Sequence, residues 1–125
     1  HGPHPRYDTL VDLEATLDGR APNFGACVDT GHFIRSGEDP VQAIRRLGKR
    51  VHGLHLKDQV ESGFFASGCL LGEGLLDLDG CFRALREIGF GPEKAISLEL
   101  EWGSDGLMTD VARCLEAARA AAAKA

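Results

Sequence analysis

Apolar residues along the chain recur at two spacings, one typical of strands and one typical of helices. Alternation with a period of two predicts strands over residues 23–29, 51–58 and 95–101. Four other segments have apolar residues three or four positions apart, which predicts helices. These segments contain Leu10 to Leu17, Val41 to Leu47, Phe82 to Ile88 and Leu107 to Ala118. In the last of them, Leu107, Val111, Leu115 and Ala118 are expected to face inward.

Residues typical of helix ends support these boundaries. Gly19 and Gly89 follow the first and third helical segments, where glycine commonly ends a helix. Asp39 precedes Pro40, a pair typical of a helix start. The third helix is expected to be capped by Asp79, and the last to begin at Ser104 or Asp105.

The order of strands and helices is typical of a parallel sheet that is covered by helices. Residues 62–74 hold four glycines, which predicts a long loop with at most a short strand inside it. The composition does not shift along the chain. A single domain is therefore expected over residues 1–125.

The two faces of each predicted strand differ in a way that favours a barrel. One face is aliphatic, and the other becomes small or polar toward the C-terminal end of the strand. The aliphatic positions are Ala26, Val28, Leu54, Leu56, Ile96, Leu98 and Leu100. An open parallel sheet is apolar on both faces, because helices cover both. A barrel meets helices only on its outside and opens into a site at its C-terminal rim.

The composition of the chain argues against some classes of binding partner. Hydrophobic residues make up 43% of the chain, and 14 Lys and Arg against 19 Asp and Glu give a net charge of −5. An acidic chain argues against nucleic acid or an anionic membrane as the main partner, and no apolar run approaches the roughly 20 residues of a membrane span. The four cysteines form no C-x-x-C pair, which favours reduced thiols in a cytoplasmic protein.

Three residues with metal-ligating side chains fall near the C-terminal ends of the predicted strands: Asp29, His55 and Glu99. In a barrel these ends share one rim, so the three side chains are expected to converge. Two carboxylates and an imidazole suit Mn, Mg, Co or Zn rather than Ca, and three ligands leave positions open for a substrate. The alternative is a turn or capping role for Asp29 and a surface ion pair for Glu99.

Four short motifs follow one another along this framework. They are Asp29-Thr30-Gly31-His32-Phe33, Val51-His52-Gly53-Leu54-His55-Leu56-Lys57-Asp58, Leu71-Gly72-Glu73-Gly74 and Ser97-Leu98-Glu99-Leu100-Glu101. With these motifs the chain resembles the xylose isomerase-like TIM-barrel superfamily, and within it the sugar phosphate isomerase/epimerase group. The resemblance covers essentially the whole chain. It implies the C-terminal half of a (β/α)₈ barrel, with strands five to eight and their outer helices.

The resemblance also implies roles for individual residues. Asp29, His55 and Glu99 would be the metal ligands of strands five, six and eight. His32 and Lys57 would contact the substrate, a small sugar or sugar phosphate. The implied reaction is isomerisation or epimerisation through a metal-stabilised enediolate, with Glu99 removing or returning the carbon-bound proton.

The length bears on activity. A complete barrel of this kind needs about 250 residues, and this chain has 125. The resemblance places a fourth ligand, usually Glu, just ahead of His1, in an N-terminal half that is expected to be absent from this chain. Three of four ligands would then be present, and the isolated chain is expected to be inactive.

Two alternatives remain. The chain could be a catalytically inactive half-barrel that dimerises to cover its open edge strands. It could also resemble the apurinic-site endonucleases of the same superfamily, which use a zinc cluster with an additional Asp-x-His. The second alternative is disfavoured, because no histidine lies between Asp58 and Leu78 and the net charge is negative.

Overall fold

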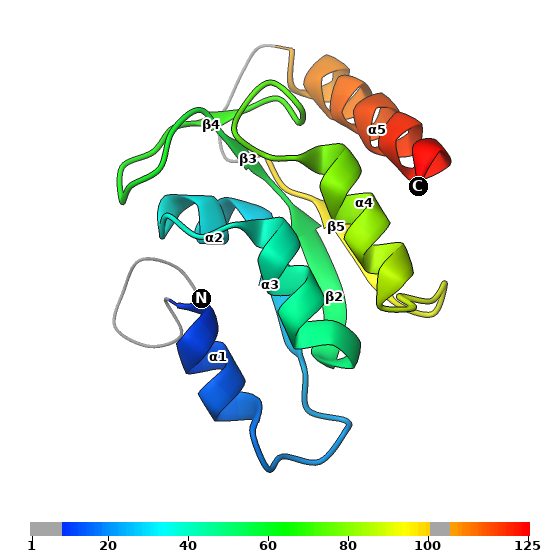
Figure 1. Ribbon diagram of the computed structural model, residues 1–125. Coiled ribbons are helices and arrows are strands. Elements are labelled where there is room, and N and C mark those ends of the chain that lie inside the picture. Colours follow the sequence, from blue (N-terminus) through cyan, green and yellow to red (C-terminus); the bar gives the residue numbers. More distant parts are fainter. Residues whose placement is uncertain (1–8, 101–105) are drawn as a thin grey trace.

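The computed structural model describes residues 9–100 and 106–125 (Figure 1). Some expectations fall outside these ranges. They concern the position of His1, the strand end at Glu101, and a helix start at Ser104 or Asp105.

Three parallel strands form the central sheet, as expected for part of a barrel. They are β1 (Ala26–Asp29), β2 (Val51–Leu56) and β5 (Ala95–Leu98), in the order β1-β2-β5. Asp29 lies opposite His55, which in turn lies opposite Ser97. The sheet register therefore brings the C-terminal ends of the three strands to one level.

The strand numbering implied by the resemblance needs a correction. Strands six and eight would be separated by strand seven, yet β2 pairs directly with β5 from Gly53↔Ala95 to Leu56↔Leu98. In the described part of the sheet, no strand therefore lies between β2, which carries His55, and β5, which Glu99 follows. The glycine-rich segment instead contributes a short antiparallel pair, β3 (Asp58–Gln59) and β4 (Gly68–Cys69), outside the sheet.

The four expected helices are present. They are α1 (Leu10–Leu17), α3 (Pro40–Leu47), α4 (Leu78–Glu87) and α5 (Leu107–Lys124). Asp39 caps α3 by accepting a hydrogen bond from the Val41 amide. The cap of α4 is Asp77 rather than Asp79, because the Asp77 carboxylate accepts from the Gly80 amide and Asp79 already lies in the first turn.

Two short helical segments were not predicted. α2 (Thr30–Arg35) begins directly after β1, and the 3₁₀ helix η1 (Gly48–Arg50) leads into β2. The Asp29 carboxylate caps α2 by accepting from the His32 amide at 2.9 Å. This last residue of β1 therefore also starts a helix.

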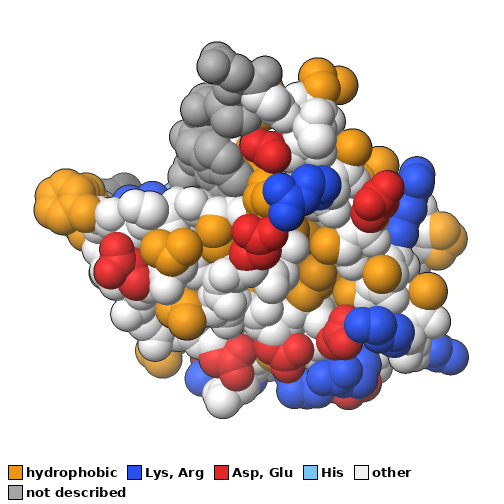
Figure 2. Space-filling model, turned by 90° about the horizontal axis from the view of Figure 1, so that it is seen from above, with side chains coloured by type: hydrophobic (Ala, Val, Ile, Leu, Met, Phe, Trp, Pro, Cys, Tyr) orange, Lys and Arg blue, Asp and Glu red, His pale blue; other side chains and the backbone are white. Residues whose placement is uncertain are grey.

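The hydrophobic core lies between the sheet and its outer helices. Val28, Leu54 and Ile44 are completely buried there, and α3 and α4 lie side by side over the same face of the sheet (Figure 1). On their outer surface, Arg45 of α3 pairs with Glu87 of α4 at 2.7 Å. Figure 2 shows acidic and basic side chains next to one another along the lower edge of its view.

Helix α5 packs through small residues rather than leucines. Cys114, Ala118 and Ala121 are its buried residues, whereas Leu107 and Leu115 are 44% and 38% exposed. The prediction that Leu107 and Leu115 face inward is therefore wrong. Cys114, on the buried face of the helix, accepts a hydrogen bond from the Leu71 amide of the glycine-rich segment at 3.3 Å, and Leu107 and Leu115 lie outside this face. Among the described residues, no helix has the length and apolar character to cross a membrane.

Candidate metal centre

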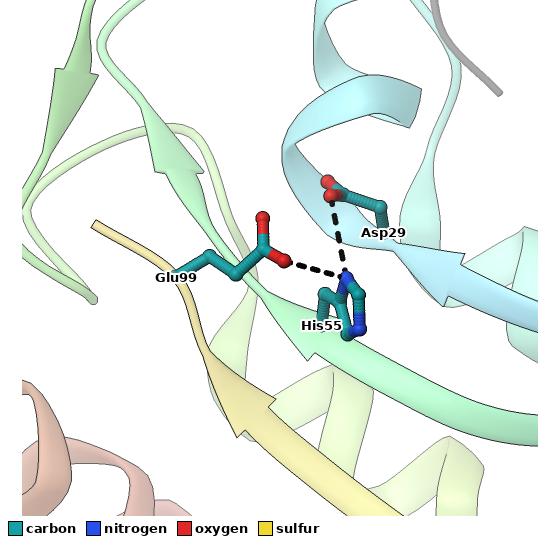
Figure 3. A group of neighbouring side chains, drawn as sticks. All are labelled: Asp29, His55 and Glu99. Atoms are coloured by element: carbon teal, nitrogen blue, oxygen red, sulfur yellow. Dashed lines mark ion pairs between the residues drawn. The ribbon is translucent and has the colours of Figure 1, made fainter. Parts of the chain in front are cut away.

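Asp29, His55 and Glu99 meet at the C-terminal end of the sheet (Figure 3). Asp29 is the last residue of β1, His55 lies one residue before the end of β2, and Glu99 follows β5 directly. The Glu99 amide donates to the carbonyl oxygen of Leu56 at 3.0 Å, so the pairing of β2 and β5 continues as far as Glu99. The predicted convergence of these three side chains is therefore present in the fold.

The distances between the three side chains fit a common metal ion. His55 Nδ1 lies 2.8 Å from Glu99 Oε1 and 3.9 Å from Asp29 Oδ2, and one ligand atom from each residue falls within 4.8 Å of the others. Ligand atoms that share a tetrahedral zinc ion at about 2.0–2.2 Å are about 3.3–3.6 Å apart. The observed distances lie on both sides of that range, so the three side chains would have to shift before all of them could contact one ion.

The centre is buried on one side and open on the other. Asp29 is only 6% exposed, whereas the side chains of His55 and Glu99 are 37% and 35% exposed. The candidate centre is therefore partly enclosed by protein and partly accessible to solvent.

Lys57 belongs to the same cluster. Its ammonium lies 2.9 Å from Glu99 Oε2 and 3.5 Å from Asp29 Oδ2, and its side chain is 2% exposed. The structure thus brings the predicted substrate-binding lysine into contact with two of the three candidate ligands. The charges of these two carboxylates are partly balanced by this one ammonium.

His32, the other predicted substrate-binding residue, lies beside Asp29. Its Nε2 is 3.7 Å from Asp29 Oδ2. Burial lowers the pKa of His32, and the charge of Asp29 opposes that shift. The negative charge of the centre also affects Cys27 on β1: partial desolvation raises the pKa of its thiol, and Asp29 and Glu99 raise it further.

Two residues of the first motif hold Lys57 in place, and sequence reasoning assigned them no role. The buried Thr30 hydroxyl donates to the Lys57 carbonyl oxygen at 2.6 Å and accepts from the Lys57 amide at 2.9 Å. Next to it, a Cβ on Gly31 would lie 2.6 Å from Lys57 Cγ and Cδ. Only glycine leaves space for the lysine side chain there, and no local spacing in the sequence indicates a contact between these two distant residues.

Asp58 is the third residue whose role sequence reasoning missed. Its carboxylate is 1% exposed and accepts four backbone hydrogen bonds of 2.8–3.0 Å. The donors are the amides of Gln59, Gly72, Gly74 and Leu76. Asp58 therefore fixes the Leu-Gly-Glu-Gly turn against the end of β2, next to Lys57.

Comparison with known proteins decides the family. The model of the xylose isomerase-like TIM-barrel family matches residues 1–123. The chain belongs to this family. Among solved structures, a xylose isomerase domain protein from Planctomyces limnophilus has a TM-score of 0.77 at 22% identity and covers 96% of this chain. An IOLI protein whose crystal structure contains a zinc atom has a TM-score of 0.58 at 24% identity, over 92% of this chain.

Two curated proteins that are similar to parts of this chain are named as enzymes. A 3-oxo-isoapionate decarboxylase from Pectobacterium atrosepticum is 38% identical over 82 residues, or 60% of this chain. An inosose dehydratase from Mesomycoplasma hyopneumoniae is 41% identical over 51 residues, or 40% of this chain. The chain matches 30% and 17% of the lengths of these two relatives. It also covers 44% and 39% of the Planctomyces and IOLI chains.

Proposed function

We propose that this chain is part of a metal-dependent enzyme that acts on the carbon next to a carbonyl group of a sugar-derived substrate. The observation that carries the proposal is the convergence of Asp29, His55 and Glu99 within 4.8 Å at the ends of three adjacent parallel strands. Family membership supports it, because the curated relatives are named as enzymes that modify sugar-derived molecules.

Asp29, His55 and Glu99 would hold the metal. Two carboxylate oxygens and one imidazole nitrogen favour manganese, cobalt or zinc, with magnesium as a weaker candidate. When bound, such an ion supplies positive charge that polarises neighbouring carbonyl and hydroxyl oxygens of the substrate. A fourth ligand, the glutamate that the resemblance places ahead of His1, is part of the same proposal.

Glu99 is the proposed acid–base residue. It projects from the end of β5 with one oxygen toward His55 and the other toward Lys57. A carboxylate in this position can accept the proton from the substrate carbon and return it. His32 and Lys57 border the same space, and we assign them contacts with the substrate oxygens, where Lys57 would stabilise developing negative charge.

Isomerisation or epimerisation is the first reaction to test. Dehydration is a second candidate, and the local identity of 41% to an inosose dehydratase favours it. Both reactions begin with removal of a proton from carbon beside a carbonyl, so one base and one charge-stabilising site serve either of them.

Proton removal can be measured before the natural substrate is known. We expect the complete protein, loaded with manganese or zinc, to exchange carbon-bound hydrogen for deuterium in D₂O. The ¹H NMR spectra of a ketose, an inosose and a 3-oxo sugar acid would show this exchange. Glu99→Gln should abolish the exchange, whereas the control Glu116→Gln, on the exposed side of α5, should leave it unchanged. Exchange at the wild-type rate in Glu99→Gln would refute the assignment.

The two edge strands of the sheet bear on how the barrel is completed. β1 and β5 are the outer strands of the three described parallel strands. We propose that their free backbone groups pair with further strands of a barrel, supplied by a longer chain or by a second copy. Light scattering distinguishes these cases, because a second copy doubles the mass of the 125-residue chain.

A further inference from the structure

The ammonium of Lys57 contacts two of the three candidate metal ligands. Lys57 Nζ contacts Glu99 Oε2 at 2.9 Å and Asp29 Oδ2 at 3.5 Å. The Asp29 oxygen is the same one that faces His55 Nδ1 at 3.9 Å. One cation is therefore already present at the carboxylates that a second, divalent cation would use.

The position of Lys57 is built into the fold. Thr30 holds its backbone through two hydrogen bonds, and Gly31 leaves a channel that no larger residue would allow. The side chains of Lys57 and Asp29 are 2% and 8% exposed, so water screens this pair weakly, whereas Glu99 is 35% exposed. Reorienting this ammonium requires movement within the site rather than exchange with solvent.

We propose that Lys57 is the counter-cation of the metal-free centre and that it competes with the divalent ion for Asp29 and Glu99. This inference rests on the metal centre proposed above. Without metal, the ammonium offsets the mutual repulsion of two carboxylates that share a partly buried site. With metal, the same ammonium faces a like charge, so it weakens metal binding and turns from the carboxylates toward substrate oxygens.

Metal titration of a charge-removing variant tests the competition. Lys57→Met keeps a long unbranched side chain and removes the ammonium, and Lys49→Met removes the same charge from an exposed position in η1 at the opposite end of β2. With zinc as the probe in isothermal titration calorimetry, Lys57→Met should bind at least about tenfold more tightly than the wild type. Lys49→Met should bind within about twofold of the wild type.

The outcomes separate this inference from the proposed function. If the wild type and both variants bind no zinc, manganese or cobalt, the metal centre itself is refuted. If the wild type binds metal and Lys57→Met binds with equal or weaker affinity, only the competition is refuted. A lysine with a purely structural role would give that last result, because its loss would disturb the ligands.

A measurement on the wild type covers the case in which Lys57→Met does not fold. Crystals of the wild-type protein would be grown with a chelator and then soaked in zinc. Competition predicts that Lys57 Nζ contacts both carboxylates in the chelated crystal and moves beyond hydrogen-bonding distance of Glu99 once zinc is bound. Unchanged contacts in the zinc-soaked crystal would overturn the proposal.

Discussion

Asp58→Asn tests whether one buried carboxylate organises the glycine-rich segment. Oδ1 of Asp58 accepts from the amides of Gln59 and Leu76, and Oδ2 accepts from those of Gly72 and Gly74. Asparagine keeps one acceptor oxygen and places an NH₂ group against the other pair of amides. Whichever way the amide is turned, two of the four hydrogen bonds are lost and two donors face a donor.

The magnitude follows from these contacts. Asp58 is 1% exposed, so water cannot replace the missing acceptor. A hydrogen bond to a charged group contributes about 1.5–3 kcal/mol. Loss of two such bonds should lower the free energy of unfolding by about 3 kcal/mol or more. Urea denaturation monitored by circular dichroism measures this difference.

Asp79→Asn is the matched control for this substitution. Asp79 has the same side chain, but that side chain is 39% exposed, and its carboxylate forms a surface ion pair with Lys124 at 3.1 Å. Its replacement should change the free energy of unfolding by less than about 0.5–1 kcal/mol. Equal losses in Asp58→Asn and Asp79→Asn would refute the view that Asp58 holds the turn.

Three further predictions concern the surroundings of the centre. Gly74→Ala should lower the free energy of unfolding by about 1–3 kcal/mol in urea, because its Cβ would lie 2.4 Å from Asp58 Oδ1; wild-type stability would contradict this. Burial raises the pKa of Cys81 to about 12, so peptide mapping after iodoacetamide treatment at pH 8 should show exposed Cys27 alkylated well before Cys81. Burial lowers the pKa of His32 below 6.5, so the unfolded chain takes up the proton first and stability falls as the pH decreases through 6.5. His32→Asn should flatten the stability profile between pH 7 and 5, and an unchanged slope would count against this assignment.

The hydrophobic pattern predicted the helices and strands well, because burial on one face imposes a period that tertiary contacts then preserve. The convergence of Asp29, His55 and Glu99 was predicted for the same reason: parallel strands end at one level, and each of these residues lies at such an end. The pattern failed for α2, whose six residues follow β1 without a break. A segment that short has too few turns to show a helical period.

Contacts between distant residues explain what the sequence could not predict. The four amides that bind Asp58 lie up to 18 residues away from it, and no local spacing links them. The space that Gly31 leaves for Lys57 is likewise visible only when β1 and β2 are side by side. The sequence also could not predict that β2 and β5 are neighbours in the sheet. The segment that joins them is long enough to contain another strand of the sheet, and only the observed pairing shows that it does not.

The way in which Asp58 binds the Leu-Gly-Glu-Gly turn has a consequence for substrate recognition. Glycine-rich turns bind phosphate when their amides point toward it without an internal partner. Here the amides of Gly72 and Gly74 already donate to Asp58, so this turn encloses an anion that belongs to the chain. A phosphorylated sugar would need donors from another part of the rim, whereas an unphosphorylated polyol or ketone would need none from this turn.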